Sequence, residues 1–293
     1  MSEASEALRP PDHETVRAAV AAALAEDRAF YDVTTRTTVP PEQQGSGVFL
    51  FKQSGVLCGI GVAREAFRQL SPDIVVEAAY PDGASVEVGT AVARIRGSLA
   101  AMLSAERVAL NFLQRMSGVA SEARRYVEEA ARGGSARVVD TRKTTPGLRA
   151  LERYAVRCGG AHNHRDNLQD GVLIKDNHIA AAAARGVDLA TVVRLARDGA
   201  AHTLRIEIEV DTAEQAAAAI AAGADVVLLD NMDPETMRSI VEAAPPGVSF
   251  EASGGVGLDT IRAIAATGVH LISVGALTHS APALDISLDL TPE

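Results

Sequence analysis

The alternation of apolar and polar residues divides the chain into an early part rich in predicted strands and a later part of repeated strand–helix units. In the early part, residues 47–52 and 91–96 alternate residue by residue, and a turn signal lies at residues 81–83. Such alternation is typical of half-buried strands. Residues 13–27 and 62–70 carry helical spacing instead. The early part therefore predicts a small α+β domain.

Residues 99–132 carry the spacing of one long helix. Its leucines form an apolar line, and four polar residues share a second face: Ser104, Arg107, Asn111 and Gln114. A polar stripe of this kind usually faces solvent. The residues alone therefore favour a helix with one buried side and one solvent-facing side.

After residue 136 the pattern changes to short apolar runs separated by alanine-rich helical segments. These runs are residues 137–140, 172–175, 206–210, 226–230, 249–253 and 271–275. From residue 206 onward they start about twenty residues apart, which is the rhythm of repeated βα units. The pattern predicts a (β/α) barrel, incomplete because it has fewer than eight strands. A doubly wound open sheet is the alternative, but no G-x-G-x-x-G sequence follows the first run.

Composition limits the partners of the protein. The 293 residues carry a net charge of −10, so nothing draws the whole protein to nucleic acid or to an anionic membrane. An anionic ligand must therefore be held by a local basic site. The two cysteines, Cys58 and Cys158, do not make a disulfide framework, and the polar, acidic N-terminus is not a secretory signal. We expect a cytoplasmic protein.

Polar residues follow almost every apolar run of the later part. At or just after the ends of the first four runs lie Arg142, Lys143, Lys175, Glu209 and Asp230. In a (β/α) barrel, the C-terminal ends of the strands build the active site. The stretch from residue 137 to residue 175 also holds eight cationic and four acidic residues. This local excess favours a ligand with several carboxylates or phosphates.

Two glycine-containing loops predict a phosphate site. One holds Ser253, Gly254 and Gly255, and the other runs from Gly275 to His279. Free backbone N–H groups in the last loops of a barrel commonly bind phosphate. Each loop alone is weak evidence, but both follow the last two runs, so we expect them to contribute to one site.

The acidic residues at the same edge predict a different contact. Glu209 and Asp230 are candidate ligands for Mg²⁺, which takes one or two carboxylates, or for the hydroxyls of a ribose. Glu207 shares the strand face of Glu209, so the sequence leaves open which of them faces the ribose. His162 and His164 form an H-x-H pair, but no thiolate or carboxylate joins it at a metal-ligand spacing. This favours anion binding by one of the two histidines over a zinc site.

Several longer segments resemble the signature segments of the quinolinate phosphoribosyltransferase family. They are D-T-R-K-T-T-P-G-L-R (140–149), G-G-A-H-N-H-R (159–165), L-I-K-D-N-H (173–178), L-L-D-N (228–231), E-A-S-G-G (251–255) and V-G-A-L-T-H (274–279). Upstream, residues 106–111 and 117–118 are similar to the family's dicarboxylate-contacting helix. The resemblance runs in order from about residue 15 to the end.

The resemblance implies an α/β protein with a small N-terminal α/β sandwich domain and an incomplete (β/α) barrel. The domains would cover residues 1–120 and 121–279, with residues 280–293 returning to the first domain. Residues 285–290 alternate as a returning strand should. The resemblance also implies a homodimer or higher homo-oligomer with shared active sites. Tyr31 departs from the pattern, because the family often has glycine there.

The implied reaction joins quinolinate to phosphoribosyl diphosphate, with Mg²⁺ as cofactor, and releases diphosphate, CO₂ and nicotinate mononucleotide for de novo NAD synthesis. The resemblance assigns quinolinate to Arg107, Arg142, His164, Arg165 and Lys175. It assigns the leaving diphosphate to Lys143 and Lys175, and the ribose and Mg²⁺ to Glu209 and Asp230. These last four residues are the expected catalytic ones. The 5-phosphate is assigned to Ser253, Gly254, Gly255, Gly275 and His279.

Three other functions stay open at this point. A class I aldolase would form a Schiff base at Lys175, and a phosphate-ligand sensor would bind without turnover. The arginines around Lys175 argue against the aldolase, because they predict several anionic groups on the ligand. A relative that takes a monocarboxylate pyridine is the third, and Arg107, Arg142 and Arg165 favour a dicarboxylate over it.

Overall fold

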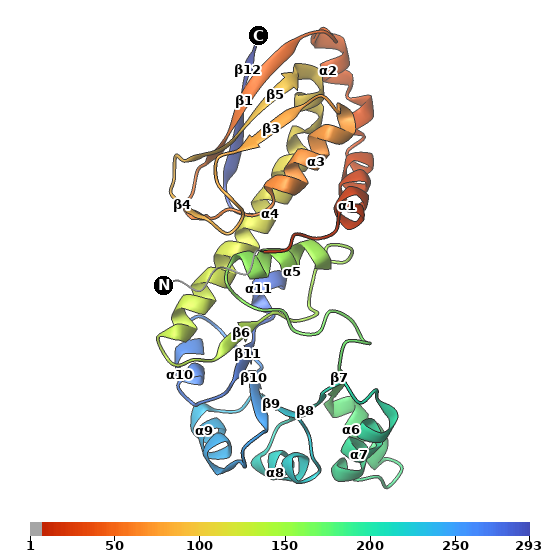
Figure 1. The fold of residues 1–293 in the computed structure, drawn as a ribbon, viewed down its shortest axis with the longest axis vertical. Helices are drawn as coiled ribbons and strands as arrows, with labels where there is room; N and C mark the ends of the chain where they lie inside the picture. Colours follow the sequence, from red (N-terminus) through yellow and green to blue (C-terminus); the bar gives the residue numbers. More distant parts are fainter. Residues whose placement is uncertain (1–7) are drawn as a thin grey trace. The chain divides into compact units, whose positions relative to one another are not determined.

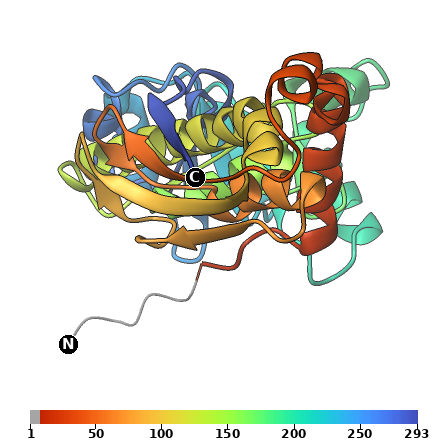
Figure 2. The ribbon, with the colours of Figure 1, turned by 90° about the horizontal axis from the view of Figure 1, so that it is seen from above.

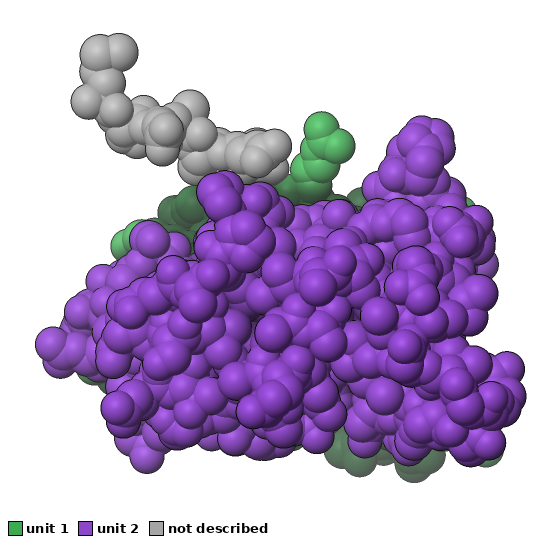
Figure 3. All heavy atoms as spheres, turned by 90° about the horizontal axis from the view of Figure 1, so that it is seen from below, with its two compact units in different colours: residues 1–124, 144–160, 277–293 green, residues 125–143, 161–276 purple. Residues whose placement is uncertain are grey.

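The computed structural model describes residues 8–293, which form two compact units. Unit 1 consists of residues 8–124, 144–160 and 277–293. Unit 2 consists of residues 125–143 and 161–276 (Figure 3). Compactness thus groups residues 144–160 with unit 1, although the sequence-based ranges place them in the barrel domain.

Unit 1 is built on an antiparallel sheet of four strands in the order β12-β1-β5-β3 (Figure 2). The strands are β1 (Gln44–Phe51), β3 (Val75–Ala78), β5 (Ala91–Ser98) and β12 (Ile286–Pro292). A second sheet pairs β2 (Gly55–Val56) with β4 (Ser85–Val86). Strand β12 pairs along the whole of β1, so the predicted return of the chain to the first domain is confirmed.

The core of unit 1 lies on one face of the four-stranded sheet. Residues along β1 alternate between buried and half-buried, as its sequence predicts. On the buried face, the ring of Phe49 meets Phe67 of helix α3 edge to face at 6.0 Å, and Gly45 lies against Leu99 and Met102 of helix α4. Because these residues are an even number of positions apart on β1, both helices cover the same face.

The three long helices of unit 1 lie where the sequence predicts helices. They are α1 (His13–Glu26), α3 (Ile60–Leu70) and α4 (Leu99–Ala131). Shorter ones are η1 (Ala29–Tyr31), α2 (Val33–Thr38), α5 (Arg149–Cys158) and α11 (Ala276–His279). Helix α4 continues beyond unit 1, since unit 2 begins at Arg125. No helix among residues 8–293 is both long enough and apolar enough to cross a membrane.

Unit 2 contains a parallel sheet of six strands in the order β6-β11-β10-β9-β8-β7. The strands are β6 (Arg137–Val139), β7 (Val172–Ile174), β8 (Ile206–Val210), β9 (Val226–Asp230), β10 (Ser249–Ser253) and β11 (Leu271–Ser273). All six predicted runs are therefore strands. From β7 to β11 each strand lies beside the next one in the chain, which is the order of a barrel and not of a doubly wound sheet.

Helices join successive strands of unit 2 and lie on the outside of the sheet (Figure 1). They are α6 (Asp176–Ala183), α7 (Leu189–Gly199), α8 (Ala213–Ala221), α9 (Pro234–Ala243) and α10 (Ile261–Ala265). On the free side of β6, an isolated parallel bridge joins Val139 to His162, so the segment before His164 adds a short stretch to the sheet. The fold is thus the predicted small α/β domain with an incomplete (β/α) barrel.

Candidate active site

A cavity of about 600 Å³ lies at the C-terminal ends of the unit 2 strands, and we call it the mouth cavity. Predicted site residues that line it are Arg142, Lys143, His164, Arg165, Lys175, Glu209, Asp230, Ser253, Gly254 and Gly255. They lie at or near the C-terminal ends of five different strands, β6 to β10, or, for His164 and Arg165, just after the bridge at His162. The expectation that strand ends converge on one site therefore agrees with the structure.

Three predicted residues do not line the mouth cavity. Gly275 follows β11 in unit 2 but is not part of the cavity wall. Arg107 and His279 belong to unit 1, and both are exposed there. Of the two glycine loops, only the one with Ser253, Gly254 and Gly255 contributes to the wall among the residues that the structure describes.

One part of the mouth cavity is cationic. Arg142, Lys143, Arg165 and Lys175 all line it. Burial, together with the positive charge of Arg142, lowers the pKa of the Arg165 guanidinium. Two guanidinium groups on one cavity wall indicate a ligand with more than one anionic group.

The acids Glu209 and Asp230 lie in the same cavity. Glu209 Oε2 is 3.0 Å from Lys175 Nζ, and the Glu209 side chain is mostly buried. The alternation of β8 explains the placement: Ile206, Ile208 and Val210 are buried on the other face of the strand, which leaves the glutamates on the inner face of the barrel. The wall thus presents acids and cations to one ligand.

The loop of residues 253–255 packs closely against the end of β9. Gly254 has a φ of +87°, and a side chain there would overlap the side-chain amide of Asn231. Asn231 itself has a φ of 53°, which is uncommon for a residue other than glycine. Its Nδ2 donates to Asp230 Oδ2 at 2.6 Å, and its backbone N–H donates to the carbonyl of Ser253 at 3.0 Å. Asn231 therefore fixes both the acid and the loop, a role that the sequence analysis did not assign.

Asp140 anchors the segment that carries the candidate histidine. It is fully buried at the end of β6. Its Oδ1 accepts the backbone N–H of His164 at 2.7 Å, and its Oδ2 accepts Nδ2 of Asn163 at 2.7 Å. These charge-assisted bonds hold residues 163 and 164 against the barrel.

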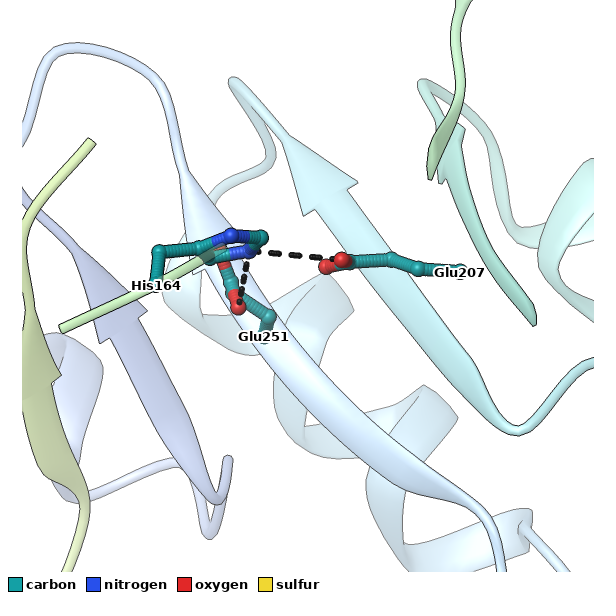
Figure 4. Close-up of side chains that lie close together, drawn as sticks. All are labelled: His164, Glu207 and Glu251. Carbon is teal, nitrogen blue, oxygen red and sulfur yellow. Dashed lines mark ion pairs between the residues drawn. The ribbon is translucent and has the colours of Figure 1, made fainter. Parts of the chain in front are cut away.

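His164 meets two buried carboxylates inside the barrel (Figure 4). Its Nε2 lies 3.3 Å from Glu207 Oε2 and 3.4 Å from Glu251 Oε2. Glu207 extends from the first half of β8, and Glu251 from the middle of β10. The side chain of His164 is 16% exposed, and that of Glu251 is 1% exposed. We call these three residues the His164 cluster.

The His164 cluster retains a proton that an isolated histidine would lose. Burial would lower the pKa of His164, but hydrogen bonds and negative charge from Glu207 and Glu251 outweigh it and raise that pKa to about 10. Burial also raises the pKa of Glu251, against the opposing effect of the His164 ring. A charged ring with a carboxylate and a neutral ring with a carboxylic acid carry the same net charge. In both arrangements Nε2 bears a hydrogen.

Donor geometry favours a proton over a metal ion at the His164 cluster. Its three donor atoms lie within 4.8 Å of one another, as the ligands of a metal ion can. However, His164 Nδ1 accepts the backbone N–H of Arg165 at 2.7 Å, so the ring hydrogen is on Nε2, which faces the carboxylates. A metal-binding imidazole needs the opposite arrangement. Spacing along the chain missed this cluster, because its carboxylates come from two distant strands.

Further residues of the mouth cavity were not among the predicted ones. They are Thr141, Leu173, Leu228, Asn231, Glu251 and Ser273. Thr141, Asn231 and Ser273 follow a rule that could have found them, since each lies at or near the end of a strand. Leu173, Leu228 and Glu251 lie inside strands.

Comparisons with known proteins agree on one family. The model "Quinolinate phosphoribosyl transferase, N-terminal domain" matches residues 32–117, and the corresponding C-terminal domain model matches residues 119–289. A protein of Bacillus subtilis (strain 168), named "Probable nicotinate-nucleotide pyrophosphorylase [carboxylating]", is 42% identical over 266 residues, covering 91% of this chain and 90% of its own. The mitochondrial quinolinate phosphoribosyltransferase [decarboxylating] 2a of Nicotiana tabacum is 37% identical over 306 residues, covering 98% and 86%.

A solved structure gives the same result for the fold. The nicotinate-nucleotide pyrophosphorylase from Francisella tularensis superimposes with a TM-score of 0.91 and 35% sequence identity, covering 98% of this chain and 100% of its own. Sequence, fold and the composition of the mouth cavity thus agree. The chain belongs to the quinolinate phosphoribosyltransferase family.

Proposed function

We propose that this protein is a quinolinate phosphoribosyltransferase, which converts quinolinate and phosphoribosyl diphosphate into nicotinate mononucleotide, diphosphate and CO₂ in de novo NAD biosynthesis. One observation carries the proposal beyond family membership. A single cavity presents two arginines, two lysines, three acids and a glycine loop. Quinolinate brings two carboxylates, and the other substrate brings a 5-phosphate, a ribose and a diphosphate, so each part of the wall has a matching group.

The cationic residues divide between the two substrates. Arg142 and Arg165 pair with the quinolinate carboxylates, because a planar guanidinium matches a carboxylate through two parallel hydrogen bonds. Lys175 completes the carboxylate site, whereas both ring nitrogens of His164 already have partners within the protein. Lys143, with Lys175, offsets the negative charge of the leaving diphosphate. Ser253 and the glycines after it hold the 5-phosphate through backbone N–H groups.

Catalysis follows from this placement. The pyridine nitrogen attacks C1 of the ribose while diphosphate leaves, through a transition state with oxocarbenium character. The protein therefore contributes mainly by positioning the reactants and by stabilising charge on the leaving group. Glu209 and Asp230 hold the ribose hydroxyls. The new cationic ring nitrogen accepts electron density when the neighbouring carboxylate leaves as CO₂.

The carboxylates of Glu209 and Asp230 also fit Mg²⁺. They are hard oxygen donors on one cavity wall, and Mg²⁺ commonly takes one or two such ligands and fills its other positions with water and substrate phosphates. When bound, the ion would offset charge on the diphosphate. The Lys175 ammonium beside Glu209 and the Asn231 amide beside Asp230 hold the two carboxylates in place.

We propose further that the enzyme acts as a homodimer with shared sites. Arg107 is exposed on helix α4 of unit 1, whereas the mouth cavity is lined by unit 2 alone. Its guanidinium would reach the quinolinate bound by a second copy of the chain. The family resemblance supports this arrangement.

The deciding experiment incubates the protein with quinolinate, phosphoribosyl diphosphate and Mg²⁺ and measures CO₂ and nicotinate mononucleotide. Equal amounts of both products are expected. Nicotinate in place of quinolinate should react poorly, because a desolvated arginine would lose its partner at a cost of about 1–3 kcal/mol. Equal turnover of both acids would contradict the dicarboxylate assignment. Borohydride trapping of a carbonyl substrate on Lys175 would instead support an aldolase.

A further inference from the structure

A second cavity of unit 2 lies behind the His164 cluster. It has a volume of about 370 Å³, and we call it the back cavity. Its wall includes Val172, Glu207 and Val226, which stand near the starts of β7, β8 and β9. The mouth cavity, in contrast, is lined by residues near the ends of these strands. The two cavities therefore approach the barrel interior from opposite ends.

Only two of the described residues line both cavities, and they are His164 and Arg165. Glu251 lines the mouth cavity, and Glu207 lines the back cavity. The His164 cluster thus forms part of the wall between them. A guanidinium does not release its proton in the working range of an enzyme, whereas an imidazole does. His164 is therefore the residue that can exchange a proton with both spaces.

The proposed reaction has a step for which no residue has yet been assigned. When the 2-carboxylate leaves as CO₂, the bond between C2 and the carboxylate carbon breaks and its electron pair stays on C2. A proton must bond to C2 to give nicotinate mononucleotide before CO₂ recombines with that electron pair, so loss of the proton donor also slows the net release of CO₂. Lys143 and Lys175 face the diphosphate in the proposed roles, and neither lines the back cavity. The proton donor must face the pyridine ring of the substrate. It must also be able to regain its proton while substrates fill the mouth cavity.

We propose that the pair formed by His164 and Glu251 donates the proton to C2, and that water in the back cavity restores it through His164. In the step, the hydrogen held by the pair bonds to the electron pair on C2, and the pair becomes one charge more negative. A proton from water in the back cavity then returns the pair to its starting charge. No oxidant, reductant or further reactant takes part. The inference rests on the proposed function.

The contacts of His164 suit this role. The backbone N–H of Arg165 and the Asp140 carboxylate fix the ring and its main chain, so Nε2 keeps its direction. Glu207 accepts from Nε2 on the side of the back cavity and is a positioning residue. Burial and the neighbouring carboxylates keep a proton on the pair at neutral pH. Transfer from such a group to a carbanion is strongly favourable, because the carbanion is far more basic.

The experiment separates the two halves of the reaction. In single turnovers with quinolinate labelled in the 2-carboxylate, diphosphate release and CO₂ release are followed separately in the wild type and in Glu251→Gln and His164→Asn. Both variants keep hydrogen-bonding groups, but each removes one member of the pair that holds the proton. The ratio of the CO₂ rate to the diphosphate rate should fall by about tenfold or more, and the ribosylated dicarboxylate should accumulate.

The back cavity is tested without touching the cluster. A side chain at Gly171, which lines this cavity, would meet no atom within 4 Å, so Gly171→Val should fold and fill part of the space. Gly171→Val should lower the ratio of the CO₂ rate to the diphosphate rate severalfold. Gly199→Val is the matched control, because Gly199 is equally open and lines neither cavity. Its ratio should equal that of the wild type.

The outcomes distinguish the two proposals. If the wild type releases no diphosphate from these substrates, the proposed function and this inference both fail. If it does, and the variants lose diphosphate and CO₂ release equally, His164 and Glu251 only bind or support the fold, and the donor role is overturned. An unchanged ratio in Gly171→Val would overturn the route through the back cavity.

Discussion

The surroundings of individual residues in the barrel interior determine their protonation. His164 lies between two carboxylates that come from strands β8 and β10. His162, two residues earlier, has the opposite surroundings. Burial and then the charge of Arg137 lower its pKa. The pKa values of the two rings of the H-x-H pair are therefore shifted in opposite directions.

This difference can be measured. In Glu251→Gln one of the two carboxylates beside His164 becomes neutral, so the pKa of His164 should fall from about 10 towards the ordinary value of 6.5. Because the wild-type pKa is raised, the proton that His164 shares with its neighbouring carboxylates persists through neutral pH and is lost only as the pH rises towards 10. NMR titration of the ring nitrogens gives both values. The pKa of His162 should be the same in the wild type and in Glu251→Gln. A wild-type His164 that titrates near 6.5 would contradict the prediction.

Arg142 gives a second test at this scale. Arg142→Lys keeps the positive charge but loses the planar pair of donors, so kcat/KM for quinolinate should fall about tenfold or more. Arg238→Lys on helix α9 makes the same chemical change at an exposed residue outside the cavity and should leave the kinetics unchanged. Wild-type kinetics in Arg142→Lys would mean that Arg142 does not clamp a carboxylate.

At the scale of elements, close approach between main chains limits what helix α4 tolerates. Gly118 lies in the helix, and a side chain there would overlap the carbonyl oxygen of Pro282, near the start of the segment that leads to β12. Gly61, in the first turn of α3, has no neighbour within 4 Å of such a side chain. The same substitution should therefore have opposite effects in the two helices.

Gly118→Ala should lower the free energy of unfolding by about 2 kcal/mol or more, because the main chain of residue 282 must move. Gly61→Ala should be neutral or raise it by about 0.5–1 kcal/mol, since alanine favours the helix more than glycine does. Urea unfolding of the three proteins measures both changes. A Gly118→Ala protein as stable as the wild type would show that α4 and this segment are not in close contact.

The elements also show what could be predicted from the sequence and why. Strands β6 to β11 were predictable because each is a short apolar run that ends at or near a polar residue. A barrel brings the C-terminal ends of its strands together. That rule placed Lys175, Glu209 and Asp230 in one cavity. The His164 cluster was not predictable, because its acids lie inside the strands and meet only after the sheet has curved.

The whole molecule raises the question of how Arg107 takes part. If its site belongs to a second copy, then Arg107→Ala and Lys143→Ala should each be nearly inactive alone but complement each other when mixed. With random exchange, half of the dimers are mixed and each has one intact site of two, so about a quarter of wild-type activity should return. Activity assays after subunit exchange measure this. Exchange without recovery would mean that Arg107 acts in its own chain or not at all.

Pairing of β12 with β1 has a consequence for synthesis of the chain. Strand β1 ends at Phe51, yet its partner on one edge consists of residues 286–292, with the whole of unit 2 encoded between them. While the ribosome is still making unit 2, this edge of β1 has open N–H and C=O groups that can pair with another nascent chain. The barrel can fold as its own strands emerge, whereas the first sheet must wait until residues 286–292 have been made. Premature termination shortly before residue 286 should therefore yield a folded barrel with an aggregation-prone sheet edge.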